Sequence, residues 1–221
     1  MTEKTLFIIG GGVKIGASVA RRFASEGFKT GLIARTQATI DAMSEAVGPG
    51  VVTGARGDAS DAESLNRGLD ALIAEMGQPD VVLYNAATWS EVPLAQLTVD
   101  DLRAAFCVNV EGLHITATKL LPAMAERQSG SLFYTSLHTH GPFPVYASLY
   151  TSKAAGTAHA LALARDAGKS GVHVAVMEVG GHVEKGNGLD PDDIADAYWG
   201  LHLEPREAWS NRTSFPSQVK S

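Results

Sequence analysis

The sequence predicts a three-layer α/β fold in which helices cover both faces of a doubly wound parallel sheet. Short apolar segments alternate with segments of helical periodicity, and several of the apolar segments are hydrophobic throughout. A glycine cluster separates the first apolar segment from the first helix. Alternating strands and helices build parallel sheets, and strands buried on both faces are apolar throughout. We therefore expect a single Rossmann-type domain over residues 1–221, with a C-terminal tail at 205–221.

Composition limits the classes of protein to which the chain can belong. Its 221 residues are 45% hydrophobic, which is enough for the core of one domain. The net charge of −6 argues against a nucleic-acid surface, and no segment approaches the ~20 apolar residues of a membrane span. The single cysteine, Cys107, excludes an internal disulfide and fits a reducing compartment. We therefore expect a cytoplasmic protein that binds neither nucleic acid nor membrane.

The first strand is expected over residues 6–9, where Gly10, Gly11 and Gly12 end it. From Ile15 onward apolar residues recur at helical spacing, so a helix follows the turn. Such a turn directs free backbone N–H groups and the positive end of the helix at one point, which suits a phosphate. Glycines let the backbone approach that phosphate, and Gly16 lets the helix pack on the strand. The alternative is a flexible turn that binds nothing.

A second strand is expected over residues 29–34 and is followed by Arg35. In a doubly wound fold, the end of this strand meets the ribose of the adenosine half of a dinucleotide. An acidic residue there accepts a hydrogen bond from the 2′-hydroxyl, whereas an arginine pairs with a 2′-phosphate. Arg35, with Lys14 nearby in the glycine turn, therefore favours NADP over NAD. The alternative is a solvated surface arginine.

The next elements are expected as a helix over 38–47, a strand over 50–55, a helix ending near 76 and a strand over 80–84. Ser60 or Asp61 is the expected N-cap of the helix that ends near 76. Asn85, Ala86 and Ala87 come directly after the fourth strand. The C-terminal ends of strands in open parallel sheets are where ligands bind, so we expect these small residues beside a ligand.

A long helix is expected from Thr98 to about residue 125. Its apolar stripe carries one polar residue, Asn109, and a buried asparagine that lacks hydrogen bonds costs ~1–3 kcal/mol. The alternatives are an asparagine satisfied within the core and one that bends the helix. A fifth strand is expected over 130–135, with Ser136 directly after it.

The remaining elements are expected as a helix to about 167, a strand over 172–179, a helix over 191–201 and an edge strand near residue 209. Pro191 suits the first position of its helix, with Asp190 as the cap. The helix that ends near 167 contains Lys153 and many alanines, which give it a smooth face that another helix can approach.

In this order and structural context, several motifs make the chain similar to the short-chain dehydrogenase/reductase family over nearly its full length. They are the glycine turn at residues 10–16, Arg35, Asp58-Ala59, Asn85-Ala86-Ala87, Asn109, Ser136, and Ser152-Lys153-Ala154-Ala155. The resemblance implies that Asp58 holds the adenine amino group and that Asn85 and Ala86 line the ribose side of the cofactor. The expected cofactor-binding residues are Gly10, Gly12, Lys14, Ile15, Gly16, Arg35, Asp58, Ala59, Asn85, Ala86, Ala87, Lys153 and Val183.

The resemblance also implies catalytic roles. The serine that Ser136 matches orients the substrate oxygen, and the counterpart of Asn109 holds a water in a proton relay. The lysine that Lys153 matches binds the nicotinamide ribose and lowers the pKa of a tyrosine. Together with Tyr146 and Tyr150, these are the expected catalytic residues, and no metal is expected.

Departures from the family pattern leave the reaction open. The family's tyrosine lies four residues before its lysine, where this chain has Leu149; Tyr150 and Tyr146 are the nearest phenols. Lys14 replaces the second glycine of the turn, and Val179-Gly180-Gly181 replaces the Asn-Pro-Gly that usually follows the sixth strand. The short segment 182–189 leaves little room for a lid. His138 and His140 are alternative proton donors, or solvated loop residues.

The leading hypothesis is an NADP(H)-dependent oxidoreductase that transfers a hydride between the nicotinamide and a carbonyl or alcohol substrate. The rival is a catalytically inactive dinucleotide-binding sensor or regulatory protein on the same fold. A third hypothesis, an assembly protein without cofactor, conflicts with the glycine turn and Arg35. Because the family commonly pairs through its two long helices, here 98–125 and 149–167, we expect a homodimer or homotetramer.

Overall fold

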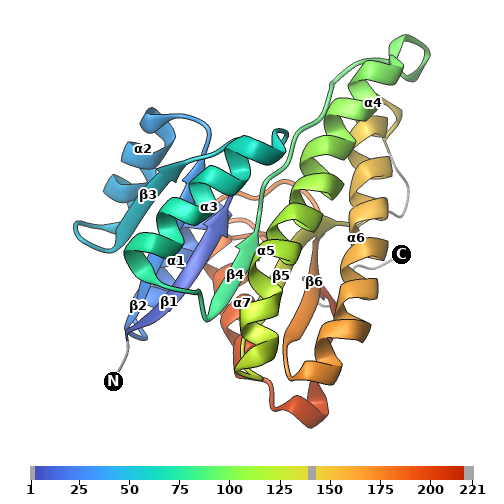
Figure 1. Cartoon of the computed structure of the whole chain (residues 1–221). Coiled ribbons are helices and arrows are strands. Elements are labelled where there is room, and N and C mark those ends of the chain that lie inside the picture. The colour runs from blue at the N-terminus through green and yellow to red at the C-terminus, as the bar shows by residue number, and fades with distance from the viewer. Residues whose placement is uncertain (1–2, 139–142, 217–221) are drawn as a thin grey trace.

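A seven-stranded parallel sheet runs through the centre of the protein (Figure 1). The computed structural model describes residues 3–138 and 143–216. The strand order is β3-β2-β1-β4-β5-β6-β7, and every neighbouring pair is parallel. The strands are β1 Lys4–Ile9, β2 Phe28–Ala34, β3 Val52–Arg56, β4 Val81–Tyr84, β5 Ser131–Leu137, β6 His173–Val179 and β7 Arg212–Phe215.

Helices cover both faces of this sheet (Figure 1). They are α1 Ile15–Ala24, α2 Gln37–Val47, α3 Ala62–Met76, α4 Val99–Phe106, α5 Gly112–Glu126, α6 Ala147–Ala167 and α7 Pro191–Leu203. One core lies between the sheet and α3, α5 and α6, and the other lies between the sheet and α1, α2 and α7. None of the helices within the described residues is long and apolar enough to cross a membrane. The predicted three-layer doubly wound fold is confirmed.

The direction of winding reverses between β1 and β4. The chain passes from β1 outward to β2 and β3, and then returns to place β4 on the other side of β1. The loops that leave β1 and β4 therefore diverge in opposite directions, and a crevice opens at the carboxyl ends of these two strands. The glycine turn and Asn85 both lie at this edge.

Side-chain caps begin the helices at several of the expected residues. The Asp61 carboxylate accepts a hydrogen bond from the N–H of Ser64, and Asp190 accepts one from Asp192. Thr98 and Asp101 satisfy each other's backbone N–H groups in a capping box. These caps confirm the helix starts expected near residues 61, 98 and 190. By contrast, β5 runs two residues further than expected, so Ser136 lies within the strand rather than after it.

The long helix expected from Thr98 is interrupted by a π-helical turn over Cys107–Glu111. The N–H of Gly112 donates to the carbonyl of Cys107, five residues earlier. Single π-helical turns of this kind are rare and often lie at functional sites. Two tyrosine hydroxyls bond to this one: Tyr84 from β4 donates to the Val108 carbonyl, and Tyr134 from β5 donates to the Asn109 carbonyl at 2.9 Å.

Glycines on two helices leave room for these hydroxyls. A Cβ atom at Gly112 would collide with the Tyr84 hydroxyl, and one at Gly156 on α6 would collide with the Tyr134 hydroxyl and the Asn109 carbonyl. Both tyrosines are fully buried, and their burial raises their pKa values far above the ordinary range. Their hydroxyls therefore act only as neutral donors.

We predict that Gly156→Ala lowers the free energy of unfolding by about 1–3 kcal/mol, because the added methyl group must displace the Tyr134 hydroxyl or the π-helical turn. Gly200→Ala on α7 is the matched control, since in the part of the chain that the structure describes no atom beyond its own helix turn lies within 4 Å of the added Cβ. That control should raise stability by a few tenths to 1 kcal/mol. Urea unfolding followed by circular dichroism measures both, and equal stabilities for the two variants would contradict the prediction.

Candidate active site

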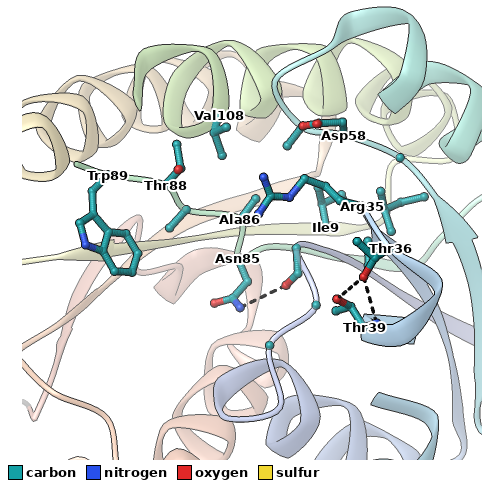
Figure 2. Close-up of a pocket in the computed structure, with 18 residues that line it drawn as sticks. Ile9, Arg35, Thr36, Thr39, Asp58, Asn85, Ala86, Thr88, Trp89 and Val108 are labelled. Carbon is teal, nitrogen blue, oxygen red and sulfur yellow. Dashed lines mark hydrogen bonds between the residues drawn. The ribbon is translucent and has the colours of Figure 1, made fainter. Parts of the chain in front are cut away.

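The crevice at the carboxyl ends of β1 and β4 forms a cavity of about 450 Å³ (Figure 2). We call it the switch-point cavity. Its walls are Ile9, Gly10, Gly11, Gly12, Ile33, Ala34, Arg35, Thr36, Thr39, Gly57, Asp58, Ala59, Asn85, Ala86, Ala87, Thr88, Trp89 and Val108. The structure thus brings together most of the residues expected to bind a cofactor. Lys14, Ile15, Gly16, Lys153 and Val183 are not among its walls.

Gly10 sets the floor of the switch-point cavity. Its φ of +91° is in the region that favours glycine, and a Cβ there would collide with the backbone of Ala86. The Gly10 carbonyl accepts a hydrogen bond from the Asn85 side-chain amide at 3.3 Å (Figure 2). At Gly16, by contrast, an added Cβ would make only ordinary contacts of 3.6 Å or more. Helix packing therefore does not require glycine at 16, contrary to our expectation; the close approach is at Gly10.

The switch-point cavity is lined by one cation, Arg35, and one carboxylate, Asp58. Arg35 extends into the cavity from the end of β2, and Asp58 follows β3 (Figure 2). Partial burial raises the pKa of the Asp58 carboxyl, but hydrogen bonds from Ser60 and the charge of Arg35 outweigh burial and hold the pKa below its ordinary value. Both the N–H and the hydroxyl of Ser60 donate to Asp58 Oδ1, at 2.9 and 2.7 Å. Asp58 is therefore an ionised acceptor.

The helix that follows the glycine turn presents an open N-terminus. No side chain caps α1, and its first turn has no acidic residue, whereas side chains cap α2, α3, α4 and α7. The preceding Lys14 donates from Nζ to the Val183 carbonyl at 2.8 Å and so ties the glycine turn to the loop after β6. The positive end of α1 suits an anionic group.

A second cavity, of about 650 Å³, lies beside the first and shares Trp89 with it. We call it the aromatic cavity. It is lined by Trp89, Glu91, Leu137, His138, Phe143, Tyr146, Leu149, Tyr150, Val179, Gly180, Gly181 and His182. Both phenols expected to be catalytic are therefore at this cavity, together with Leu149. Trp89 and Glu91 are contributions that our sequence analysis did not anticipate.

Asn109 is completely buried and fixes the segment between the two cavities. Its side-chain oxygen accepts from the N–H of Thr88 at 3.2 Å, and its amide donates to the Thr88 carbonyl at 2.9 Å and to Ser152 Oγ at 2.8 Å. Asn109 therefore holds the chain after β4 against the helix that carries Lys153. The hydrogen-bonding requirement of a buried asparagine is met within the protein.

Lys153 is 4% exposed and points from α6 toward the crevice. Its ammonium donates to the Thr135 carbonyl at 2.8 Å and the Ala86 carbonyl at 3.2 Å, and it lies 4.6 Å from the centre of the Tyr134 ring. Burial lowers its pKa from 10.5 to about 7. Because Ala86 lines the switch-point cavity, Lys153 lies directly behind the wall of that cavity.

Ser136 is buried, and its hydroxyl lies 2.8 Å from that of Thr157 on α6 and 3.5 Å from the Lys153 carbonyl. It lines neither of the two cavities. Successive side chains of a strand point to opposite faces, and the next residue, Leu137, is the one that lines the aromatic cavity. The structure therefore does not bring Ser136 together with the two phenols.

The two phenols differ in their surroundings. The Tyr146 hydroxyl donates to Glu91 Oε1 at 3.0 Å, and this hydrogen bond and the carboxylate charge raise the pKa of Tyr146. Tyr150 lies one position beyond Leu149 on α6 and lines the same cavity. Of the two phenols, Tyr146 is thus the one whose hydroxyl is tied to a carboxylate.

His138 is the imidazole at the end of β5. It lines the aromatic cavity, while its Nε2 atom is buried with no hydrogen-bond partner in the described part of the chain. A side chain at position 180, where the protein has glycine, would crowd the Cδ2 atom of His138. His140, the other candidate histidine, lies outside the described residues.

Comparison with known proteins extends over most of the chain. The model of the short chain dehydrogenase family matches residues 4–184. Oxidoreductase asL5 of Sarocladium schorii is 35% identical over 159 residues, which cover 70% of this chain and 62% of that protein. Cis-1,2-dihydrobenzene-1,2-diol dehydrogenase of Pseudomonas putida is 25% identical over 134 residues, covering 58% and 48%. The chain thus spans less than two thirds of the length of these relatives.

Solved structures show the same fold. A metagenomic short-chain oxidoreductase, crystallised in complex with NADP, superposes with a TM-score of 0.84 at 23% identity and covers 96% of this chain and 95% of its own. At this level of identity the similarity shows the architecture alone.

The buried ammonium of Lys153 generates a prediction for stability against pH. Its pKa is lower in the folded protein than in the unfolded chain, so the unfolded chain binds more protons between about pH 7 and 10.5. Stability linked to this group therefore rises with pH in that window, by at most about 1.4 kcal/mol per pH unit. The free energy of unfolding of wild type, relative to Lys153→Met, should grow between pH 7 and pH 9.

Loss of the two hydrogen bonds to carbonyls lowers the stability of Lys153→Met at every pH, so only the trend with pH tests the prediction. Lys169→Met is the control, because the Lys169 side chain is 76% exposed and its charge stays in water on unfolding. Urea titrations at pH 6, 7.5 and 9 give the trend. A difference between wild type and Lys153→Met that is constant with pH would contradict it.

Proposed function

The chain belongs to the short-chain dehydrogenase family, and on this premise we propose that it is an NADP(H)-dependent oxidoreductase that interconverts a carbonyl compound and an alcohol. The observation that carries the proposal is the pair of adjoining cavities. One has the glycine turn, Arg35 and Asp58 among its walls, and the other has Tyr150. NADP-bound neighbours such as the metagenomic oxidoreductase agree with this choice of cofactor.

The residues of the switch-point cavity fit a phosphorylated dinucleotide. Among the described residues, and apart from the chain neighbours of Gly12, only the Asn85 side-chain nitrogen lies within 4 Å of a Cβ added at Gly12, at 3.9 Å, so the turn leaves open space there. The uncapped N-terminus of α1 suits a pyrophosphate, the Arg35 guanidinium suits a 2′-phosphate, and the Asp58 carboxylate suits an adenine amino group. NAD, which lacks the 2′-phosphate, is the less favoured cofactor. When bound, the nicotinamide supplies or accepts the hydride.

In this proposal the protein's own residues handle the proton. Tyr150 donates it to the substrate oxygen during reduction and takes it back during oxidation. Lys153, one helical turn further along α6, provides the positive charge that stabilises the phenolate. Asn109 bonds to Ser152, the neighbour of Lys153 on α6, and to Thr88 in the wall between the cavities. It therefore holds Lys153 and this wall in fixed positions relative to each other. The proposal gives Ser136 no contact with the substrate, since its hydroxyl is bonded to Thr157 on α6 and it lines neither cavity.

The alternative of a non-catalytic dinucleotide-binding protein rests on two leucines. Leu137 and Leu149 both line the aromatic cavity, so neither position offers a hydroxyl to a substrate oxygen. Turnover then depends on Tyr150, and its substitution separates the two proposals.

We predict that Arg35→Ala weakens NADPH binding by about tenfold to a hundredfold and leaves NADH binding nearly unchanged, because a charge-assisted pair with the 2′-phosphate is worth about 1.5–3 kcal/mol. Arg103→Ala is the matched control, since Arg103 pairs with Asp100 on the surface of α4. Fluorescence titration of both cofactors measures the effect. Equal affinity of the wild type for NADPH and NADH would refute this choice of cofactor.

We predict that Tyr150→Phe lowers turnover by about a hundredfold or more with NADPH affinity intact, and that Tyr146→Phe has a much smaller effect. Oxidation of NADPH with a panel of aldehydes and ketones, alongside NADPH titration, measures both quantities. Full activity in Tyr150→Phe would exclude its role and make His138 the next candidate. Wild type that binds NADPH without turning over any substrate, with activity appearing only in Leu149→Tyr, would establish the non-catalytic alternative.

A further inference from the structure

The aromatic cavity has one fixed charge that the proposed reaction does not use. Glu91 is exposed, lines this cavity and accepts the Tyr146 hydroxyl at Oε1, but it forms no ion pair with any described residue. No lysine or arginine is among the described residues that line the cavity. The four residues at 139–142 are Thr, His, Gly and Pro, which add no fixed charge of either sign.

Aromatic side chains line the same cavity as this carboxylate, and one of them is bonded to it. Trp89 is 49% exposed and Phe143 is 63% exposed, although both line the cavity, and the Tyr146 ring is held beside Glu91 by its hydroxyl. Ring faces that stay accessible next to a carboxylate attract a cation through the ring quadrupole and through its charge. The same arrangement repels an anionic group.

The backbone holds Trp89 and Glu91 in these positions. Alternate residues of the segment that leaves β4 are bonded to helices: Thr88 to Asn109, and Ser90 to Ser148 through its N–H at 3.1 Å. The Ser90 hydroxyl also donates to Asp101, which adds a second negative charge behind the segment. Trp89 lies between the bonded residues Thr88 and Ser90, and Glu91 follows Ser90. Both line the cavity. The carboxylate is thus presented by a fixed wall.

Resting on the proposed function, we propose that the substrate of this site is an amine-bearing carbonyl or alcohol with an apolar body. Its protonated amino group lies at the mouth of the aromatic cavity, between the Glu91 carboxylate and the rings of Trp89 and Tyr146. Its apolar body occupies the part lined by Leu137, Leu149 and Val179, near Tyr150.

A matched set of three aryl ketones tests this inference. Titrate 4-(aminomethyl)acetophenone, 4-ethylacetophenone and 4-acetylphenylacetate, which place a cation, a neutral group and an anion at the same position, into the protein at pH 8 by calorimetry. The wild type should bind the cationic ketone about tenfold more tightly than the neutral one, and the anionic ketone least tightly. Glu91→Gln should remove this preference while leaving the affinity for the neutral ketone within about twofold.

Glu126→Gln, an exposed carboxylate at the far end of α5, is the control and should keep the wild-type preference. The inference is overturned if the neutral ketone binds as tightly as the cationic one, if the preference survives in Glu91→Gln, or if no ketone binds at millimolar concentration. Calorimetry measures ketone affinity without turnover. Tighter binding of the cationic ketone, with no oxidation of NADPH by any ketone, would therefore refute the oxidoreductase proposal and leave the amine proposal standing. Oxidation of NADPH with the neutral ketone, without cationic preference, would refute the amine proposal alone.

Discussion

Two buried hydroxyls, those of Tyr84 and Tyr134, are the donors on which the site depends. They come from adjacent strands and donate to the Val108 and Asn109 carbonyls of the π-helical turn at Cys107–Glu111. A buried hydroxyl or carbonyl without a partner costs about 1–3 kcal/mol, so these bonds tie the turn to the sheet. The π-helical turn then places Asn109 against the segment after β4 and against α6. The sheet therefore positions the candidate active site through side chains as well as through strand ends.

This arrangement explains how two cavities of different character lie side by side. The switch-point cavity is built from strand ends and a glycine turn, so backbone groups and a few polar side chains dominate it. The aromatic cavity is built from the chain after β4, the end of β5, the start of α6, and the end of β6 with the turn after it. Large rings and leucines are among its lining residues. Hydrogen bonds from the backbone N–H groups of Thr88 and Ser90 to Asn109 and Ser148 fix the wall between them. One cavity suits a polar phosphorylated ligand, and the other suits a molecule with an apolar body.

Features set by local physics could be predicted from the sequence, and features set by long-range contacts could not. The caps at Asp61, Thr98 and Asp190 depend on neighbouring residues, and the glycine turn sits between a strand and a helix that the pattern reveals. The buried state of Asn109 was likewise predictable, but its partners 21 and 43 residues away were not. The strand β5 runs two residues further than the sequence pattern predicts. Leu137, and not Ser136, then lines a cavity. Glu91 and Tyr146 lie 55 residues apart, so only the fold reveals their pairing.

Trp89 lines both cavities, and this shared position limits how the protein can diverge. A substitution of Trp89 that changes the size or shape of its side chain to admit a different substrate also alters the switch-point cavity. Adaptation of substrate preference is therefore easier at positions such as Phe143 and His182, which line the aromatic cavity and not the switch-point cavity. Among relatives that share Trp89, we expect sequence variation to concentrate at Phe143 and His182. We expect residue 89 to change only together with residues of the switch-point cavity.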